Sequence, residues 1–220
     1  MSLRLPFTSR AARAIKPTAF APAIRSALPR LPPTKPAQYR MTSVLSSAAN
    51  TAHSAFASLA SVAQTKPGDT VPNVDIKIDS PEGKLNLSSL TGKNVVVTVP
   101  GAFSGVCTNQ IPSYIAQYDA FKAKGVKDVY VVAVNDIFVV NAWKDKLEEG
   151  KASGIKYAAD DSAKLAASLG LVLDAVPVFG GPRLKRGALI IEDGKVQHVA
   201  VEDSPGDITV SHADSVLKAL

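Results

Sequence analysis

The chain has 220 residues, 46% of them hydrophobic, and a formal net charge of +6 at pH 7. This length suits one compact domain with an additional terminal segment, and no apolar run approaches the ~20 residues that span a bilayer. A single cysteine excludes an intramolecular disulfide and any zinc or iron–sulfur site built from several cysteines.

The basic residues are concentrated near the N-terminus. Residues 1–68 contain nine of the 25 Lys and Arg side chains and none of the 19 Asp and Glu side chains. Residues 69–220 therefore carry 16 basic and 19 acidic side chains and are mildly acidic. The basic isoelectric point belongs to the N-terminal segment, and we expect neither a nucleic acid nor a membrane as a partner of the remainder.

The N-terminal segment has the composition of a targeting sequence. Residues 1–40 are rich in Arg, Ser, Ala and Pro and lack acids, which predicts a mitochondrial transit peptide. Basic residues interrupt the apolar run that a secretory signal needs, and a basic arm for acidic partners is the alternative. Residues 41–65 are interpreted as a linker, and a second start at Met41 would yield a cytosolic form.

Residues 66–220 have the pattern of a folded domain in which strands and helices alternate. Short β-branched apolar runs predict strands buried on both faces, and alternating apolar residues predict half-exposed strands. Helical periodicity predicts helices that begin near residue 107 and at residues 139, 162 and 211. This order of elements predicts an α/β fold with a mixed sheet and helices on both faces. Strands are expected at 74–78, 85–87, 94–99, 128–134, 155–160, 186–191 and 196–201.

The connecting segments carry more specific predictions. Residues 80–83, Ser-Pro-Glu-Gly, predict a turn between the first two strands, and residues 192–194, Glu-Asp-Gly, predict a tight hairpin turn. Ser162 is a candidate N-cap for a helix that would extend to Val172. Residues 176–182 are predicted to be irregular.

Cys107, the only cysteine, lies between a predicted buried strand and a predicted helix. Pro100 and Gly101 end the strand, and apolar residues at helical spacing follow the cysteine. A thiol at a helix N-terminus lies near unpaired backbone N–H groups and the positive end of the helix dipole, which favour the thiolate. A small buried cysteine without reactivity is the alternative that a lone thiol leaves open.

The residues around Cys107 resemble a known family. The spacing Pro-x-x-x-Ser-x-x-Cys at Pro100, Ser104 and Cys107 is similar to the peroxiredoxin signature, and residues 100–103, Pro-Gly-Ala-Phe, resemble its peroxiredoxin-5 (type II, atypical) branch. The resemblance implies a thioredoxin fold with peroxiredoxin additions. It further implies that Cys107 is the peroxidatic nucleophile, that the Ser104 hydroxyl hydrogen-bonds the thiolate and the peroxide, and that Pro100 shields the pocket.

The same family supplies an arginine to the site. Residues 183–186, Arg-Leu-Lys-Arg, are similar to its motif, and the resemblance assigns this role to Arg186. Arginine suits the stabilisation of a thiolate and of a departing oxygen because it offers several fixed donors and keeps its proton. Arg183 and Lys185 are interpreted as solvated loop charges, and no role is assigned to Gln110.

Two further stretches are similar to the family, so that the resemblance extends over roughly residues 66–220. Residues 67–72, Pro-Gly-Asp-Thr-Val-Pro, resemble the segment that opens the domain in this branch. Residues 135–143 match its Asn-Asp-x-Phe-x-x-x-x-Trp stretch. Tyr114, Phe138 and Trp143 are expected to be core or interface aromatics rather than catalytic groups.

The resemblance implies a thiol peroxidase that reduces hydrogen peroxide and organic hydroperoxides and contributes to cell redox homeostasis. Attack on the peroxide would convert Cys107 to a sulfenic acid, which an external thiol has to reduce because the chain has no second cysteine. We expect glutathione with glutaredoxin, or thioredoxin, as the reductant, and no bound cofactor or metal. The family implies a homodimer, and the N-terminal segment a location in the mitochondrion, in the matrix.

Two other functions are weighed against this one. A Cys–His hydrolase would need one of His53, His198 or His212 as a base beside Cys107, and none has the sequence context of such a base. A peroxide-sensing redox-signalling adaptor of thioredoxin fold would use the same sulfenic acid to form a mixed disulfide with a client. Fast reaction with peroxide but poor turnover by reductants would favour the adaptor.

Overall fold

The structure, a computed structural model, describes residues 62–220. The predicted transit peptide at residues 1–40 and most of the predicted linker lie outside these residues. Thr65, at the end of that linker, is buried, and its N–H donates to the Leu169 carbonyl at 2.8 Å. Packing against the domain therefore begins at or before Thr65.

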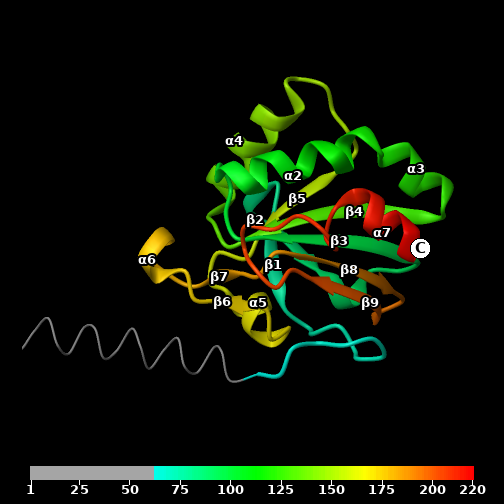
Figure 1. The fold of residues 1–220 in the computed structure, drawn as a ribbon, viewed down its shortest axis with the longest axis horizontal. Helices are drawn as coiled ribbons and strands as arrows, with labels where there is room; N and C mark the ends of the chain where they lie inside the picture. The colour runs from blue at the N-terminus through cyan, green and yellow to red at the C-terminus, as the bar shows by residue number, and fades with distance from the viewer. Residues whose placement is uncertain (1–61) are drawn as a thin grey trace, which may run out of the picture. The chain divides into compact units, whose positions relative to one another are not determined.

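A seven-stranded mixed sheet lies at the centre of the domain, with the strand order β2-β1-β5-β4-β3-β8-β9 (Figure 1). β4 is parallel to both β3 and β5, whereas β8 and β9 at one edge and β1 and β2 at the other pair in antiparallel fashion. A separate two-stranded ribbon is formed by β6 (Val172–Leu173) and β7 (Arg183–Leu184). The strands of the main sheet are β1 (Asp75–Ile78), β2 (Ser80–Asn86), β3 (Lys93–Val99), β4 (Val126–Ala133), β5 (Lys156–Ala159), β8 (Gly187–Glu192) and β9 (Lys195–Val201).

Helices cover both faces of this sheet, as the sequence predicts for its α/β fold. Residues of α2, α3, α4 and α7 join the core on one face, and residues of α5 join the core on the other. Within the described residues, no helix has the length and apolar character needed to cross a membrane. The helices are α2 (Gly105–Ala116), α3 (Tyr118–Ala123), α4 (Ile137–Glu148), α5 (Lys164–Ser168), α6 (Val176–Phe179) and α7 (Ala213–Ala219), with a 3₁₀ turn η1 (Leu87–Ser89).

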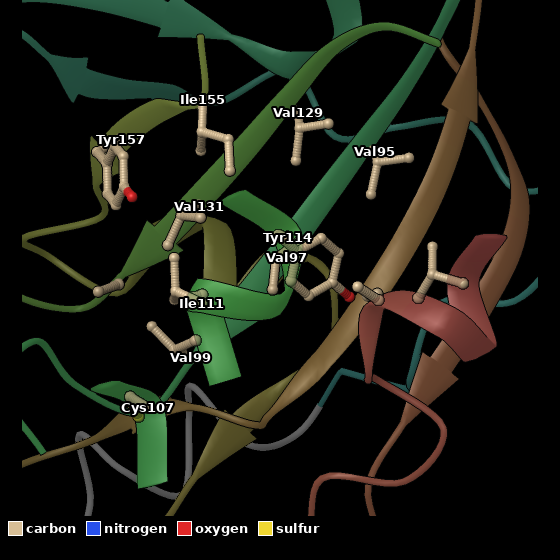
Figure 2. Close-up of a cluster of buried hydrophobic side chains, with 14 of the residues drawn as sticks. Val95, Val97, Val99, Cys107, Ile111, Tyr114, Val129, Val131, Ile155 and Tyr157 are labelled. Carbon is tan, nitrogen blue, oxygen red and sulfur yellow. The ribbon is translucent and has the colours of Figure 1, made fainter. Parts of the chain in front are cut away.

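The two cores follow from the alternation of side chains along the central strands. Val95, Val97 and Val99 of β3 lie in the core beneath α2, whereas Val96 lies in the core beneath α5. Figure 2 shows the first of these cores, in which Val97 and Val99 lie near Ile111 of α2. The buried strands predicted at 94–99 and 128–134 are confirmed as β3 and β4.

Several predicted boundaries are wrong. The predicted turn at residues 80–83 is part of β2, because Asp79 with φ +62° turns the chain one residue earlier. Residues 176–182, predicted to be irregular, contain the short helix α6. The helix predicted from Cys107 onward is two helices, which meet at Gln117.

The start and end of α5 also differ from the prediction. Ser162 does not cap this helix; the capping position is Ala163, in the left-handed conformation with φ +55°. The Asp160 carboxylate, at the end of β5, instead accepts hydrogen bonds from the Leu165 and Ala166 N–H groups at 3.1 and 2.8 Å. Val172, expected on the same helix, lies in β6. Tertiary contacts with β5 and β7 therefore decide where α5 begins and ends.

Candidate active site

The chain delivers Cys107 to the first turn of α2. β3 ends at Val99, and a tight connection, in which Phe103 takes the left-handed conformation with φ +60°, leads to Ser104 at the N-cap. The first helical hydrogen bond runs from the Thr108 N–H to the Ser104 carbonyl at 2.9 Å. Cys107 is the third helical residue, so its N–H lies before this bond and has no partner within the helix. The predicted position of the thiol at a helix N-terminus is confirmed.

The register of β8 against β3 brings Arg186 to the same place. Gly187 pairs with Thr98, so that Arg186, which precedes Gly187, lies beside the end of β3. The Thr98 hydroxyl donates to the Lys185 carbonyl at 2.8 Å and fixes this approach. Arg186 is only 2% exposed. The structure therefore brings together two of the predicted site residues that are 79 positions apart.

The guanidinium of Arg186 contacts the thiol directly. Its Nη2 lies 3.4 Å from Cys107 Sγ, and Nη1 donates to Gln110 Oε1 at 2.7 Å. Nε and Nη2 both donate to the Pro205 carbonyl, at 3.1 and 2.9 Å. None of these partners is a carboxylate, so Cys107 is the only one that can carry a negative charge. A guanidinium placed in this way can stabilise negative charge that develops on the sulfur or on an oxygen bound next to it.

Pro100 and Ser104 lie on a pocket above the thiol. The pocket has a volume of about 260 Å³ and is lined mainly by apolar groups, with Arg186 in its wall. Cys107 is fully buried and packs on Val99 and Ile111 (Figure 2). In residues 62–220 no hydrogen bond joins the Ser104 hydroxyl to Cys107. Cys107 does not itself line the pocket, so a reactant held there reaches the sulfur only when the covering residues are displaced.

Gln110 is a functional candidate that the sequence prediction missed. It is completely buried, and its Nε2 donates to the Ser211 carbonyl and hydroxyl at 3.0 and 2.9 Å. This leaves Oε1 facing Arg186. The available signal was its position: Cys107, Gln110, Ile111 and Tyr114 follow the i, i+3, i+4, i+7 spacing of one buried helix face. A polar residue within such a stripe needs a buried partner.

Arg183 is not the solvated loop charge that the sequence predicted. Its Nη2 donates to the Phe179 carbonyl at 3.1 Å, Nη1 donates to the Val134 carbonyl, and the guanidinium lies 5.3 Å from the centre of the Phe179 ring. Burial lowers the pKa of Arg183. Arg183 thus attaches α6, which forms one wall of the pocket, to the end of β4. For Lys185, half-buried in the loop before β8, no side-chain hydrogen bond is seen in residues 62–220.

The three aromatic residues that the sequence predicts in the core or at an interface differ in their burial. Tyr114 and Trp143 are fully buried, whereas Phe138 is 69% exposed at the start of α4. His198 lies in β9 and His212 caps α7, and neither is hydrogen-bonded to Cys107 in the described part of the chain. His53 lies outside that part. No cluster of three or more possible metal-binding side chains is found among residues 62–220.

Comparisons with known proteins cover nearly all of the described residues 62–220. The sequence profile of the family described as Redoxin matches residues 66–217. The chain is 40% identical over 153 residues to peroxisomal membrane associated protein 20 of Schizosaccharomyces pombe, across 70% of this chain and 97% of that relative. It is 37% identical over 192 residues to the mitochondrial peroxiredoxin-2F of Arabidopsis thaliana, across 81% of this chain and 94% of that relative. The chain belongs to the peroxiredoxins, in the type II (peroxiredoxin-5) branch.

A solved structure places this peroxiredoxin in the same fold. Reduced Prx3 of Vibrio vulnificus in complex with hydrogen peroxide superposes with a TM-score of 0.66 at 36% identity, over 71% of this chain and 100% of that chain. The predicted thioredoxin fold with peroxiredoxin additions is confirmed. Members of the family are thiol peroxidases, so this peroxiredoxin is an oxidoreductase that reduces peroxides with electrons from thiols.

Proposed function

We propose that this peroxiredoxin reduces hydroperoxides by a one-Cys cycle in which Cys107 is the peroxidatic nucleophile. The observation that carries the proposal is a buried guanidinium, that of Arg186, at 3.4 Å from the only thiol of the chain. Because the hydrogen-bond partners of Arg186 include no carboxylate, its positive charge is available to the thiolate and to the oxygen anion that forms as the peroxide bond breaks.

The first half of the cycle consumes the peroxide. The Cys107 thiolate attacks one oxygen of ROOH, the S–O bond forms and the O–O bond breaks, and RO⁻ leaves and takes up a proton to become ROH. The sulfur is oxidised to the sulfenic acid, and the peroxide is reduced by two electrons. Arg186 stabilises both the attacking and the departing anion, and the free N–H groups at the start of α2 add to this field.

Ser104 and Pro100 act on the peroxide rather than on the resting thiol. Ser104 lies on the pocket at the N-cap of α2, where its hydroxyl can hydrogen-bond a peroxide bound above Cys107. Pro100 has no N–H and keeps that part of the wall apolar. The apolar lining and the volume of about 260 Å³ suit hydrogen peroxide and small organic hydroperoxides.

The second half of the cycle requires thiols from other molecules. One external thiol condenses with the Cys107 sulfenic acid and releases water, and a second thiol cleaves the mixed disulfide and restores Cys107. The chain supplies no second cysteine for an internal disulfide. Glutathione with glutaredoxin, or thioredoxin, is the proposed reductant, and no bound cofactor takes part. The result is a contribution to cell redox homeostasis.

The proposed location is the mitochondrion, with the matrix as the working compartment. The composition of residues 1–40 supports it. A relative whose name includes "mitochondrial" matches 81% of this chain, so that the match extends beyond the Redoxin region at residues 66–217. A relative associated with the peroxisomal membrane makes the peroxisome the competing location. Fluorescence microscopy of the full chain fused to a C-terminal reporter, with and without residues 1–40, distinguishes the two.

The test of the chemistry is a stopped-flow measurement of peroxide reduction by the reduced full-length protein. Cys107→Ser is expected to abolish the reaction, and Arg186→Ala to slow it by ~10²-fold, the scale for loss of one preorganised charge-stabilising group. Turnover with glutathione and glutaredoxin is compared with turnover with thioredoxin and its reductase. A rapid first reaction with no turnover by either system would support the adaptor function instead, and an unchanged rate for Arg186→Ala would refute its role.

A further inference from the structure

A buried carboxylate, that of Glu202, lies beside the active site and outside the chemistry described so far. Glu202 directly follows β9 and is 7% exposed. Its N–H donates to the Arg186 carbonyl at 2.9 Å, which continues the pairing of β9 with β8 by one residue on each side. Among residues 62–220 no Lys or Arg side chain forms an ion pair with it.

All the hydrogen bonds of the Glu202 side chain go to the segment that precedes α7. Oε1 accepts from the Thr209 N–H at 2.7 Å, from the Ser211 N–H at 2.8 Å and from the Ser211 hydroxyl at 2.7 Å. Oε2 accepts from the Thr209 hydroxyl at 2.6 Å. Burial by itself would raise the pKa of Glu202, but the hydrogen bonds from Thr209 and Ser211 outweigh it and lower the pKa. The Glu202 carboxylate is therefore ionised at neutral pH and can only accept hydrogen bonds. It anchors the segment that precedes α7.

Ser211 connects this anchor to the active site. Because its hydroxyl proton points to Glu202, the hydroxyl oxygen is left to accept from Gln110 Nε2, and the Ser211 carbonyl accepts from the same nitrogen. Gln110 then presents Oε1 to Arg186. A reversed amide would set its NH₂ against the guanidinium, donor against donor. The direction of every hydrogen bond from Glu202 to Arg186 is thus determined.

We propose that Glu202 is a positioning residue for the peroxidase reaction, which holds the Arg186 guanidinium against Cys107 through Ser211 and Gln110. This inference rests on the proposed role of Arg186. Glu202 itself touches neither the sulfur nor the pocket above it. Its contribution is to hold Ser211 in place, so that two acceptors of Ser211 fix the Gln110 amide and Gln110 fixes one arm of the guanidinium.

The test measures alkylation of Cys107 by iodoacetamide across pH, together with the stopped-flow rate of peroxide reduction, in the full-length protein. Alkylation reports the thiolate of a single residue because the chain has no other cysteine. Glu202→Ala is expected to slow both reactions by about tenfold at neutral pH, the scale of a lost buried hydrogen-bond network, and to move the alkylation profile to higher pH. Glu202→Gln keeps an oxygen that can accept from Ser211, and is expected to restore most of the rate.

Thr209→Val is the matched control. It removes the hydroxyl bond to Oε2 of the same carboxylate but leaves the bonds that lead through Ser211 to Gln110. We expect it to leave both rates as in the wild type. A tenfold loss in Thr209→Val would assign Glu202 a general supporting role in this loop and overturn the proposal.

A double-mutant cycle separates this inference from the function on which it rests. If Glu202 acts through Arg186, then Glu202→Ala has no further effect in an Arg186→Ala background. An additional tenfold loss there, or wild-type rates in a folded Glu202→Ala, would overturn the inference. Wild-type rates in Arg186→Ala alone would instead refute the proposed function. If Glu202→Ala lacks a native circular dichroism spectrum, Ser211→Ala replaces it, and wild-type rates in that variant would equally overturn the inference.

Discussion

Position 187, directly after Arg186, has room only for a glycine. A Cβ atom on Gly187 would lie 2.7 Å from the Ala200 carbonyl oxygen and 3.3 Å from the Cα of Val201. Both atoms belong to the backbone of β9, which pairs with β8 at this point and has little freedom to move. The close approach of β9 to β8 therefore leaves no room for a side chain directly beside Arg186.

Gly187→Ala is therefore expected to destabilise the fold. Displacing backbone to relieve such a contact costs about 1–3 kcal/mol, which urea unfolding followed by circular dichroism measures directly. The peroxide rate should fall as well, because the strand would shift next to Arg186. Gly181→Ala is the matched control in the same part of the chain, since no atom lies within 4 Å of its added Cβ. Equal unfolding free energies for the two variants would contradict the expectation.

The residues of the site could be predicted from sequence only where a local motif carries them. Pro100, Ser104 and Cys107 fall within eight positions, and their spacing was sufficient to group them. Arg186 was assigned through the family motif, and the structure places it on the thiol. Gln110 was missed because its partners, Arg186 and Ser211, lie 76 and 101 positions away. No periodicity encodes contacts of that range.

At the scale of elements, the prediction succeeded where a local pattern decides the structure. β3 and β4 are β-branched runs, and the β8–β9 hairpin turns at Asp193 and Gly194, which both adopt positive φ as a two-residue turn requires. The prediction misplaced the start of α5 because this start depends on the carboxylate of Asp160, directly after β5, rather than on Ser162. A cap that comes from outside the helix cannot be recognised from the sequence of the helix itself.

The link between β9 and the segment before α7 has a dependence on pH. Since the pKa of Glu202 is lower in the folded protein than its ordinary value of 4.5, its contribution to stability is complete above that pH and is lost as the pH falls through the folded value. Glu202→Gln resembles the protonated state at all pH values. We expect the wild type to have the higher melting temperature at pH 7, and the difference to shrink below about pH 4.5. A difference that stays constant down to pH 3 would contradict this linkage.

At the scale of the whole molecule, three exposed apolar side chains lie on segments that contact one another, and one of the three, Val178, lines the pocket. Phe103, Phe138 and Val178 are 55%, 69% and 78% exposed. Their segments are in contact, because the Ala102 N–H donates to the Asn135 side chain at 2.9 Å and Phe179 packs on the connection before α2. Apolar surface of this kind marks a protein interface. A second copy of this chain is the proposed occupant, in keeping with the homodimer expected for the family.

The dimer is tested by size-exclusion chromatography with light scattering. The wild type is expected to elute as a dimer at micromolar concentration, and Phe138→Asp as a monomer, because a carboxylate in an apolar interface loses its hydration without gaining a partner. Val210→Asp is the control and is expected to remain a dimer, since Val210 is 45% exposed but lies in the segment between β9 and α7, outside the proposed interface. A wild-type protein that is monomeric at these concentrations would rule out the proposed dimer.

Among the described residues, no carboxylate is a hydrogen-bond partner of the Arg186 side chain, and this has a consequence for the redox cycle. In the proposed cycle the attacking Cys107 thiolate lies against the buried guanidinium, whereas the sulfenic acid that follows is neutral and leaves Arg186 with no anion among its hydrogen-bond partners. Each turnover of the proposed cycle thus removes the one anion that can pair with the Arg186 guanidinium and then restores it, so that the charge at this buried position alternates with the oxidation state of the sulfur.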